Sequence, residues 1–249
     1  MAGAVKHSRK FGAAYFALAA IVGVAVGTFV LLVERPAPKP PPPWSLWKPT
    51  AAASAERATE IAEFVGAQYH LESGKRLVRV VVGGPGSSTD PIRALAVAKK
   101  ANVQTQSDFD IVDASNTMMF ILCGSGKNCS IEEGKPSEAR AAMLRREALE
   151  LALYTFEYVR GADSVVTFFP PKPGDDPTFA LYFRKDDLDH QLDHPLARTL
   201  PKRRAPLPGK LSTNERKTID DLTTTRVFRF ELQRARSGER VLVLSPVVG

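Results

Sequence analysis

The segment from Asp186 to His194 (DDLDHQLDH) holds the densest group of side chains in the sequence that can bind a metal or move a proton. In a helix, His190 and His194 lie one turn apart on the same face, about one turn after Asp187. Imidazole and carboxylate groups arranged in this way can hold a divalent metal, and a metal with an open position activates water. One hypothesis is therefore a membrane-tethered, metal-dependent hydrolase. The alternative is a solvated connecting segment, because the stretch is polar on all sides and Pro195 ends any helix there.

Cys123 and Cys129 are the only cysteines in the chain, and the flexible residues GSGKN separate them. A zinc site needs two further ligands nearby, and the spacing is not the C-x-x-C of a redox motif. In a domain outside the cytoplasm, the simplest expectation is a disulfide between them. Free thiols and a redox role are the alternatives.

A glycine-rich turn, Gly83 to Asp90 (GGPGSSTD), follows a valine-rich run, where nucleotide-binding proteins cradle phosphate. No Lys-Ser/Thr pair completes a P-loop, and Thr89 stands where the third glycine of G-x-G-x-x-G belongs. A structural turn is therefore favoured over a phosphate site, and no cofactor is predicted.

A basic stretch runs from Arg198 to Lys217 and is interrupted by prolines. It is interpreted as a solvated loop, or as a contact for anionic lipid or an anionic polymer. The net charge of +7 is modest, and no nucleic-acid-binding fold signature is present, so no nucleic-acid partner is predicted. Its main basic residues are Arg198, Lys202, Arg203, Arg204 and Lys210.

Two segments have the apolar spacing of amphipathic helices that would position these groups. The first begins at Ser54 and is expected to end near Gly74; the second runs from Pro136 to Arg160. In the second, the predicted inner stripe is Leu144, Ala148, Leu151, Ala152, Thr155 and Val159. The charged residues are placed mostly off it: Arg140, Arg146, Glu147, Glu150 and Glu157.

Short runs rich in valine, isoleucine and phenylalanine predict the strands of a sheet. The stretch Pro91–Ala101 fits either a short helix or a strand. These patterns predict an α+β fold: one soluble domain, residues 53–249, with a mainly antiparallel sheet packed against the long helix. The predicted strands are Leu77–Val82, expected to be buried, then Phe109–Val112, Thr117–Leu122, Val165–Phe169, Phe179–Phe183, Val227–Leu232 and Arg240–Leu244.

The run from Phe11 to Val33 is uncharged and long enough to cross a bilayer as a helix. We interpret it as a signal anchor with residues 1–10 in the cytoplasm and the domain outside the cytoplasm, because large domains translocate with little regard to their own charge. A cleaved leader and an inverted topology, with the domain in the cytosol, are the alternatives.

Within that run, Ala19, Gly23 and Gly27 recur every four residues and place small side chains on one helix face. Such a face favours close helix pairing and a homodimer, although small residues are also common in membrane spans. Residues 34–52 then form a proline-rich stalk. Trp44 and Trp47 at its end are expected to dock on the domain, with the membrane surface as the alternative.

The leading functional hypothesis is a single-pass membrane protein of the cell envelope whose domain is a non-catalytic binding or scaffold module. Its expected partners are the lipid bilayer and an envelope protein or anionic polymer. This inference rests on architecture, which is a weak guide to function.

Overall fold

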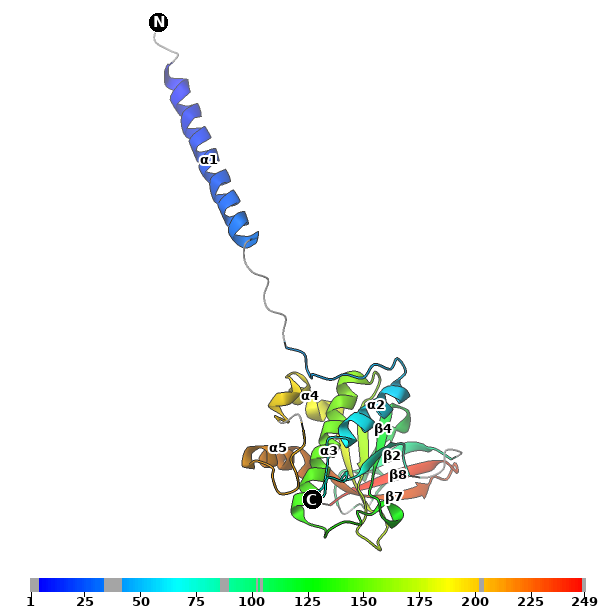
Figure 1. Cartoon of the computed structure of the whole chain (residues 1–249). Helices are drawn as coiled ribbons and strands as arrows, with labels where there is room; N and C mark the ends of the chain where they lie inside the picture. The colour runs from blue at the N-terminus through cyan, green and yellow to red at the C-terminus, as the bar shows by residue number, and fades with distance from the viewer. Residues whose placement is uncertain are drawn as a thin grey trace. The chain divides into compact units, whose positions relative to one another are not determined.

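The computed structural model describes residues 5–33, 42–85, 90–101, 103, 105–201 and 204–247. The chain divides into two compact units, Met1–Pro42 and Pro43–Gly249, and each is described by itself (Figure 1). The described residues form five α-helices and eight strands.

The first unit contains α1 (Val5–Val33), whose window Gly12–Phe29 is long and apolar enough to cross a membrane. None of this window is buried inside the protein, which separates it from the core helix of a soluble domain. Its length and composition are those of a membrane span or of a signal sequence.

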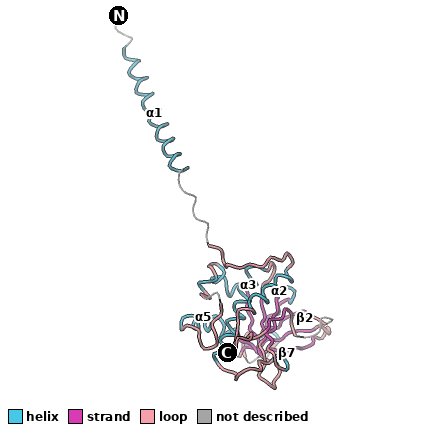
Figure 2. Tube along the Cα trace, viewed as in Figure 1, coloured by secondary structure: helices cyan, strands magenta, loops and turns pink. Residues whose placement is uncertain are grey.

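The second unit is an α+β domain, in which groups of two to four strands are separated by helices along the chain (Figure 2). Its helices are α2 (Ser54–Gly66), α3 (Glu138–Tyr158), α4 (Asp189–Leu192) and α5 (Thr213–Thr223). Its strands are β1 (Arg79–Val82), β2 (Ile92–Ala98), β3 (Phe109–Asp113), β4 (Thr117–Cys123), β5 (Ser164–Phe168), β6 (Phe179–Arg184), β7 (Val227–Arg234) and β8 (Arg240–Pro246).

The eight strands form one mixed sheet in the order β1-β4-β5-β6-β7-β8-β2-β3. Two of its pairings, β2 with β8 and β4 with β5, are parallel, and the other five are antiparallel. The stretch Pro91–Ala101 thus contributes the strand β2 and not a helix. The prediction that Leu77–Val82 forms a buried strand is wrong in part: Leu77 and Val78 are buried, but β1 is the end strand of the sheet and its residues are exposed or half-buried.

Two hydrophobic clusters fill the domain, one on each face of the sheet. In the first, buried residues of α2 and α3 join Phe120, Val165 and Phe183 of the central strands. The second includes Leu95 of β2 and Met119 of β4, which four intervening strands separate in the sheet order. The sheet therefore curves around the second cluster.

Both amphipathic helices form, with differences from the sequence expectation. The first ends at Gly66 and not near Gly74, because the chain then turns into a short hairpin in which Leu77 N donates to Tyr69 O (3.0 Å). The second, α3, begins after Ser137, whose side chain caps it by accepting from Arg140 N. Arg146, Glu147 and Glu150, which were placed off the inner stripe, are buried as well.

Candidate binding groove

The segment predicted to bind a metal is broken into a turn of 3₁₀ helix, Lys185–Leu188, and the single-turn α4. The rings of His190 and His194 lie 5.1 Å apart, but Asp187 turns to other partners. Its carboxylate accepts from Arg184 N (3.1 Å) and lies 3.6 Å from Arg226 Nε. Over the described residues, no group of three or more His, Cys, Asp or Glu side chains is placed to hold a metal. The metal-dependent hydrolase thus gains no geometric support.

The sulfur atoms of Cys123 and Cys129 are bonded to each other as a disulfide. The intervening loop folds back on itself, with Gly124 N donating to Cys129 O (2.8 Å). A Cβ at Gly124 would lie 2.2 Å from the carbonyl oxygen of Ser130, so only glycine fits there. The loop therefore holds a fixed position at the end of β4.

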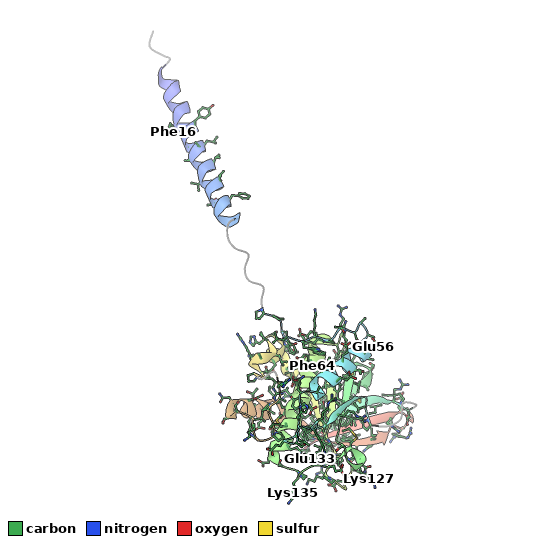
Figure 3. All side chains as sticks on the ribbon, in the orientation of Figure 1. Phe16, Glu56, Phe64, Lys127, Glu133 and Lys135 are labelled. Atoms are coloured by element: carbon green, nitrogen blue, oxygen red, sulfur yellow. A yellow bond between two sulfur atoms is a disulfide. The ribbon has the colours of Figure 1, made fainter. Side chains whose placement is uncertain are left out.

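A groove of about 420 Å³ lies beside this disulfide loop. The hairpin after α2 supplies Lys75 and Arg76, and β1 supplies Arg79, which lies opposite Cys123 in the sheet. Glu133 also lines the groove, and Figure 3 shows it at the end of the domain away from Glu56. The apolar lining consists of Leu71, Leu77, Val78 and Ile131.

The groove has an excess of positive charge. Lys75 Nζ lies 3.3 Å from Glu133 Oε2, and a hydrogen bond from Ser73 together with this ammonium holds the pKa of Glu133 below its ordinary value. Arg76 and Arg79 are exposed and form no ion pair with any described residue. The groove can therefore offer two guanidinium groups above an apolar lining, which suits a ligand that carries carboxylate or phosphate groups.

A second groove of about 360 Å³, between β2–β3 and β6–β7, contains Asp187. Its charges largely satisfy one another: Lys99 lies 3.1 Å from Asp110, and Asp187 lies near both Arg184 and Arg226. Because its cations are already paired, it is the weaker candidate for binding an anion.

The glycine-rich turn is described only as far as Pro85, and residues 86–89 lie outside the described part. At its end, the carboxylate of Asp90 lies 2.6 Å from Arg234 and 3.2 Å from Arg240. This acidic side chain therefore ties the segment before β2 to the β7–β8 hairpin, and the choice between a structural turn and a phosphate site stays a prediction.

The remaining predicted site residues are on the surface. Arg198, Arg204 and Lys210 are exposed, while Lys202 and Arg203 lie outside the described residues. Lys217, which was assigned to the same basic loop, is in α5. Ala19, Gly23 and Gly27 are exposed on α1, and a Cβ at either glycine would meet nothing within 4 Å.

The two tryptophans dock on the domain through an extended segment, Pro43–Ala51, which we name the aromatic strap. The Trp47 ring stacks on Phe64 with centroids 4.0 Å apart, and the Trp44 ring meets Tyr154 edge to face at 5.4 Å. The carbonyl oxygen of Trp44 also accepts from Leu196 N (2.8 Å). These contacts fix the start of the domain against α2 and α3.

A buried ionic network, which the sequence analysis missed, joins α3 to α5. Arg146, 1% exposed, donates to Glu215 Oε1 (2.8 Å) and Glu150 Oε2 (3.0 Å), and Tyr69 donates to the same Glu150 oxygen (2.6 Å). Burial lowers the pKa of Arg146, but Tyr69 and the two carboxylates outweigh it and raise the net value. A sequence signal for α5 was present: Ser212, followed three residues later by Glu215, is a capping box pattern.

Comparison with known proteins gives no relative. The chain matches no protein-family model, no curated protein and no solved structure. Any function must therefore be argued from the residues of this chain.

Proposed function

We propose that the protein is a single-pass membrane protein that holds a non-catalytic binding module outside the cytoplasm, where the module binds an anionic partner of the cell envelope. The anchor is α1, whose apolar window has no buried residue. The disulfide between Cys123 and Cys129 supports the compartment, because disulfides persist in oxidising environments.

The observation that carries the proposal is that Arg76 and Arg79, in the groove beside the disulfide loop, form no ion pair with any described residue. Five of the 34 lysines and arginines and one of the 27 acidic residues precede Pro43, so the domain itself has a net charge of only about +3. Such a small excess gives little general attraction for polyanions. Binding of an anionic partner should therefore be local to the groove.

The proposal is tested with the full chain in bilayer nanodiscs of neutral phosphatidylcholine and poly-L-glutamate as the anionic probe. Replacing two exposed arginines in a binding site removes roughly 1 kcal/mol or more, so the double variant Arg76→Gln/Arg79→Gln should bind about fivefold to tenfold more weakly. Affinity of the unmodified chain should also fall as salt is raised.

The matched control is Arg229→Gln/Arg236→Gln, which removes the same charge from exposed positions outside the groove. This control should bind like the unmodified chain. Equal weakening in both double variants would reduce the effect to net charge, and an unmodified chain that does not bind the probe would refute the anionic partner.

A further inference from the structure

The strand β3 ends the sheet opposite to β1, and no described strand pairs with its outer edge. Lys99 N donates to Asp108 O (2.9 Å), and the register continues through Val97 opposite Asp110. Hydrogen-bonded and non-hydrogen-bonded pairs alternate in an antiparallel ladder, so the backbone groups of Phe109, Ile111 and Asp113 point away from β2. A sheet end of this kind can pair with another strand.

The side chains at this edge are unusual for a protected strand. Ile111 is 64% exposed, and its cross-strand neighbour is Ala96. Ala96 and Ala98 are themselves 7% and 4% exposed, yet they belong to neither hydrophobic cluster. Since side chains alternate along a strand, Ala96, Ala98 and Ile111 lie on the face of β2 and β3 opposite to Leu95, which packs in the second cluster.

We propose that β3 pairs with β3 of a second copy of this chain, antiparallel about a two-fold axis at Ile111. In that register Ile111 lies opposite Ile111 of the second copy, and Phe109 lies opposite Asp113. The backbone groups that point outward on one copy meet those that point outward on the other, as an isologous contact requires. The two isoleucines, both now exposed, cover each other.

Charge favours this partner and register. Asp110 would lie opposite Val112 and is already neutralised by Lys99, 3.1 Å away. The Asp113 carboxylate accepts from Ser115 N (2.8 Å), so no two unpaired acids face each other. The Asp113 carbonyl oxygen already accepts a long hydrogen bond from Thr117 Oγ1 (3.4 Å) and is therefore less available to the second copy. The central Ile111 pair thus forms the main part of the ladder.

The other end strand, β1, does not offer the same contact. It has only four residues, begins with the exposed Arg79, and places Val81 at 37% exposure. Gly83 N donates to Met119 O, so the backbone groups of Val80 and Val82 point away from β4. The side chains of both valines are half-buried against the first hydrophobic cluster, so a pairing about Val80 would cover no exposed apolar side chain. The two ends of the sheet thus differ in their self-complementarity.

The contact area of a single strand pair is small. Anchoring two copies in one bilayer raises their effective concentration and so favours the contact. That gain rests on the proposed anchoring through α1. The test therefore uses the full chain reconstituted in phosphatidylcholine vesicles, with vesicle flotation as a separate readout. A chain that fails to float with the vesicles contradicts the anchor, not the strand pairing.

Cysteine cross-linking reads the register. Both native cysteines are in the disulfide, so an introduced cysteine is the only free thiol. Hydrogen-bonded antiparallel partners have Cα atoms about 5.5 Å apart, which a disulfide can bridge. Mild oxidation should join Phe109→Cys to Asp113→Cys in mixed vesicles, whereas Asp113→Cys should not join itself, because those positions are about 14 Å apart along the ladder.

Ile111→Lys added to both copies places like charges opposite each other and should lower the cross-linked fraction about tenfold. The matched control, Leu232→Lys on β7, is 39% exposed and should leave the cross-linked fraction unchanged. All variants should unfold at the same temperature, so that a loss of cross-linking is not a loss of folding. Val81→Cys should give no cross-link. Efficient Asp113–Asp113 or Val81–Val81 cross-linking would indicate random collision or pairing through α1 and would overturn the proposal, as would absence of the Phe109–Asp113 product.

Discussion

Glu147 lies fully buried in α3, and neither carboxylate oxygen has a hydrogen-bond partner among the described residues. Burial raises its pKa well above the ordinary value, the nearby charge of Glu150 raises it further, and Arg146 offsets only part of this. The folded domain therefore holds Glu147 in its neutral form over a wider pH range than the unfolded chain does.

Linkage gives the direction of the effect on stability. A carboxyl group with a raised folded pKa costs nothing below its unfolded pKa near 4, and its cost grows as pH rises toward the folded pKa. Glu147→Gln, which removes the ionisation, should therefore raise the free energy of unfolding by roughly 1–3 kcal/mol at pH 7 and change it little at pH 4. Urea unfolding at both pH values measures this difference.

Glu157→Gln is the control, since Glu157 is exposed on the same helix. It should alter stability by less than about 0.5 kcal/mol at pH 7. If Glu147→Gln instead lowered the free energy of unfolding at neutral pH, Glu147 would carry a charge stabilised by Arg146. That result would contradict the assignment of a neutral buried acid.

At the residue scale, the burial of these charged side chains of α3 was not predicted from the sequence. The inner stripe of α3 was predicted correctly, but a one-stripe pattern assumes that only one face is covered. Here α5 covers a second face and supplies Glu215 to Arg146. That partner lies 69 positions along the chain, in a segment interpreted as a basic loop, so periodicity within α3 alone does not reveal it.

At the scale of elements, the strands other than β2 were predictable because each is a short run rich in β-branched or aromatic residues. The alanine-rich β2 fitted a helix equally well. The order of the strands was not predictable, because the parallel pairings of β2 with β8 and of β4 with β5 join segments that the local pattern cannot relate. For the same reason the end position of β1 was missed, and with it the exposed Arg79 in the groove. The metal hypothesis depended on one continuous helix, which the structure divides near Leu188.

The aromatic strap is an element without regular secondary structure that still contributes to stability. Trp47 stacks on Phe64 and also meets Tyr154 edge to face at 5.5 Å. Trp47→Ala should therefore lower the free energy of unfolding by about 2–3 kcal/mol. Chemical denaturation of the full chain in detergent measures the change.

Leu46 provides the control from the same strap, because its side chain is 81% exposed. Leu46→Ala should change stability by less than about 0.5 kcal/mol. If Trp47→Ala were equally silent, the strap would not be docked in solution, and the alternative of tryptophans at the membrane surface would gain support.

At the scale of the whole molecule, the two units differ in the solvent that favours them. The window Gly12–Phe29 is apolar and wholly exposed within the protein, so water is an unfavourable solvent for it. The domain, by contrast, buries its apolar residues in two clusters of its own. An amphiphilic chain of this kind is expected to partition into a bilayer through α1.

The direction of insertion that we propose keeps the segment with Lys6, Arg9 and Lys10 in the cytoplasm. Intact cells that express single-cysteine variants should react with a membrane-impermeant thiol reagent at Ser237→Cys, in the exposed β7–β8 turn, and not at Ser8→Cys. Since Cys123 and Cys129 are bonded, the unmodified chain supplies the unlabelled background. Permeabilised cells should label both variants, which controls for reactivity. Labelling of Ser8→Cys alone in intact cells would place the domain in the cytosol, and it would also remove the oxidising compartment that the disulfide requires.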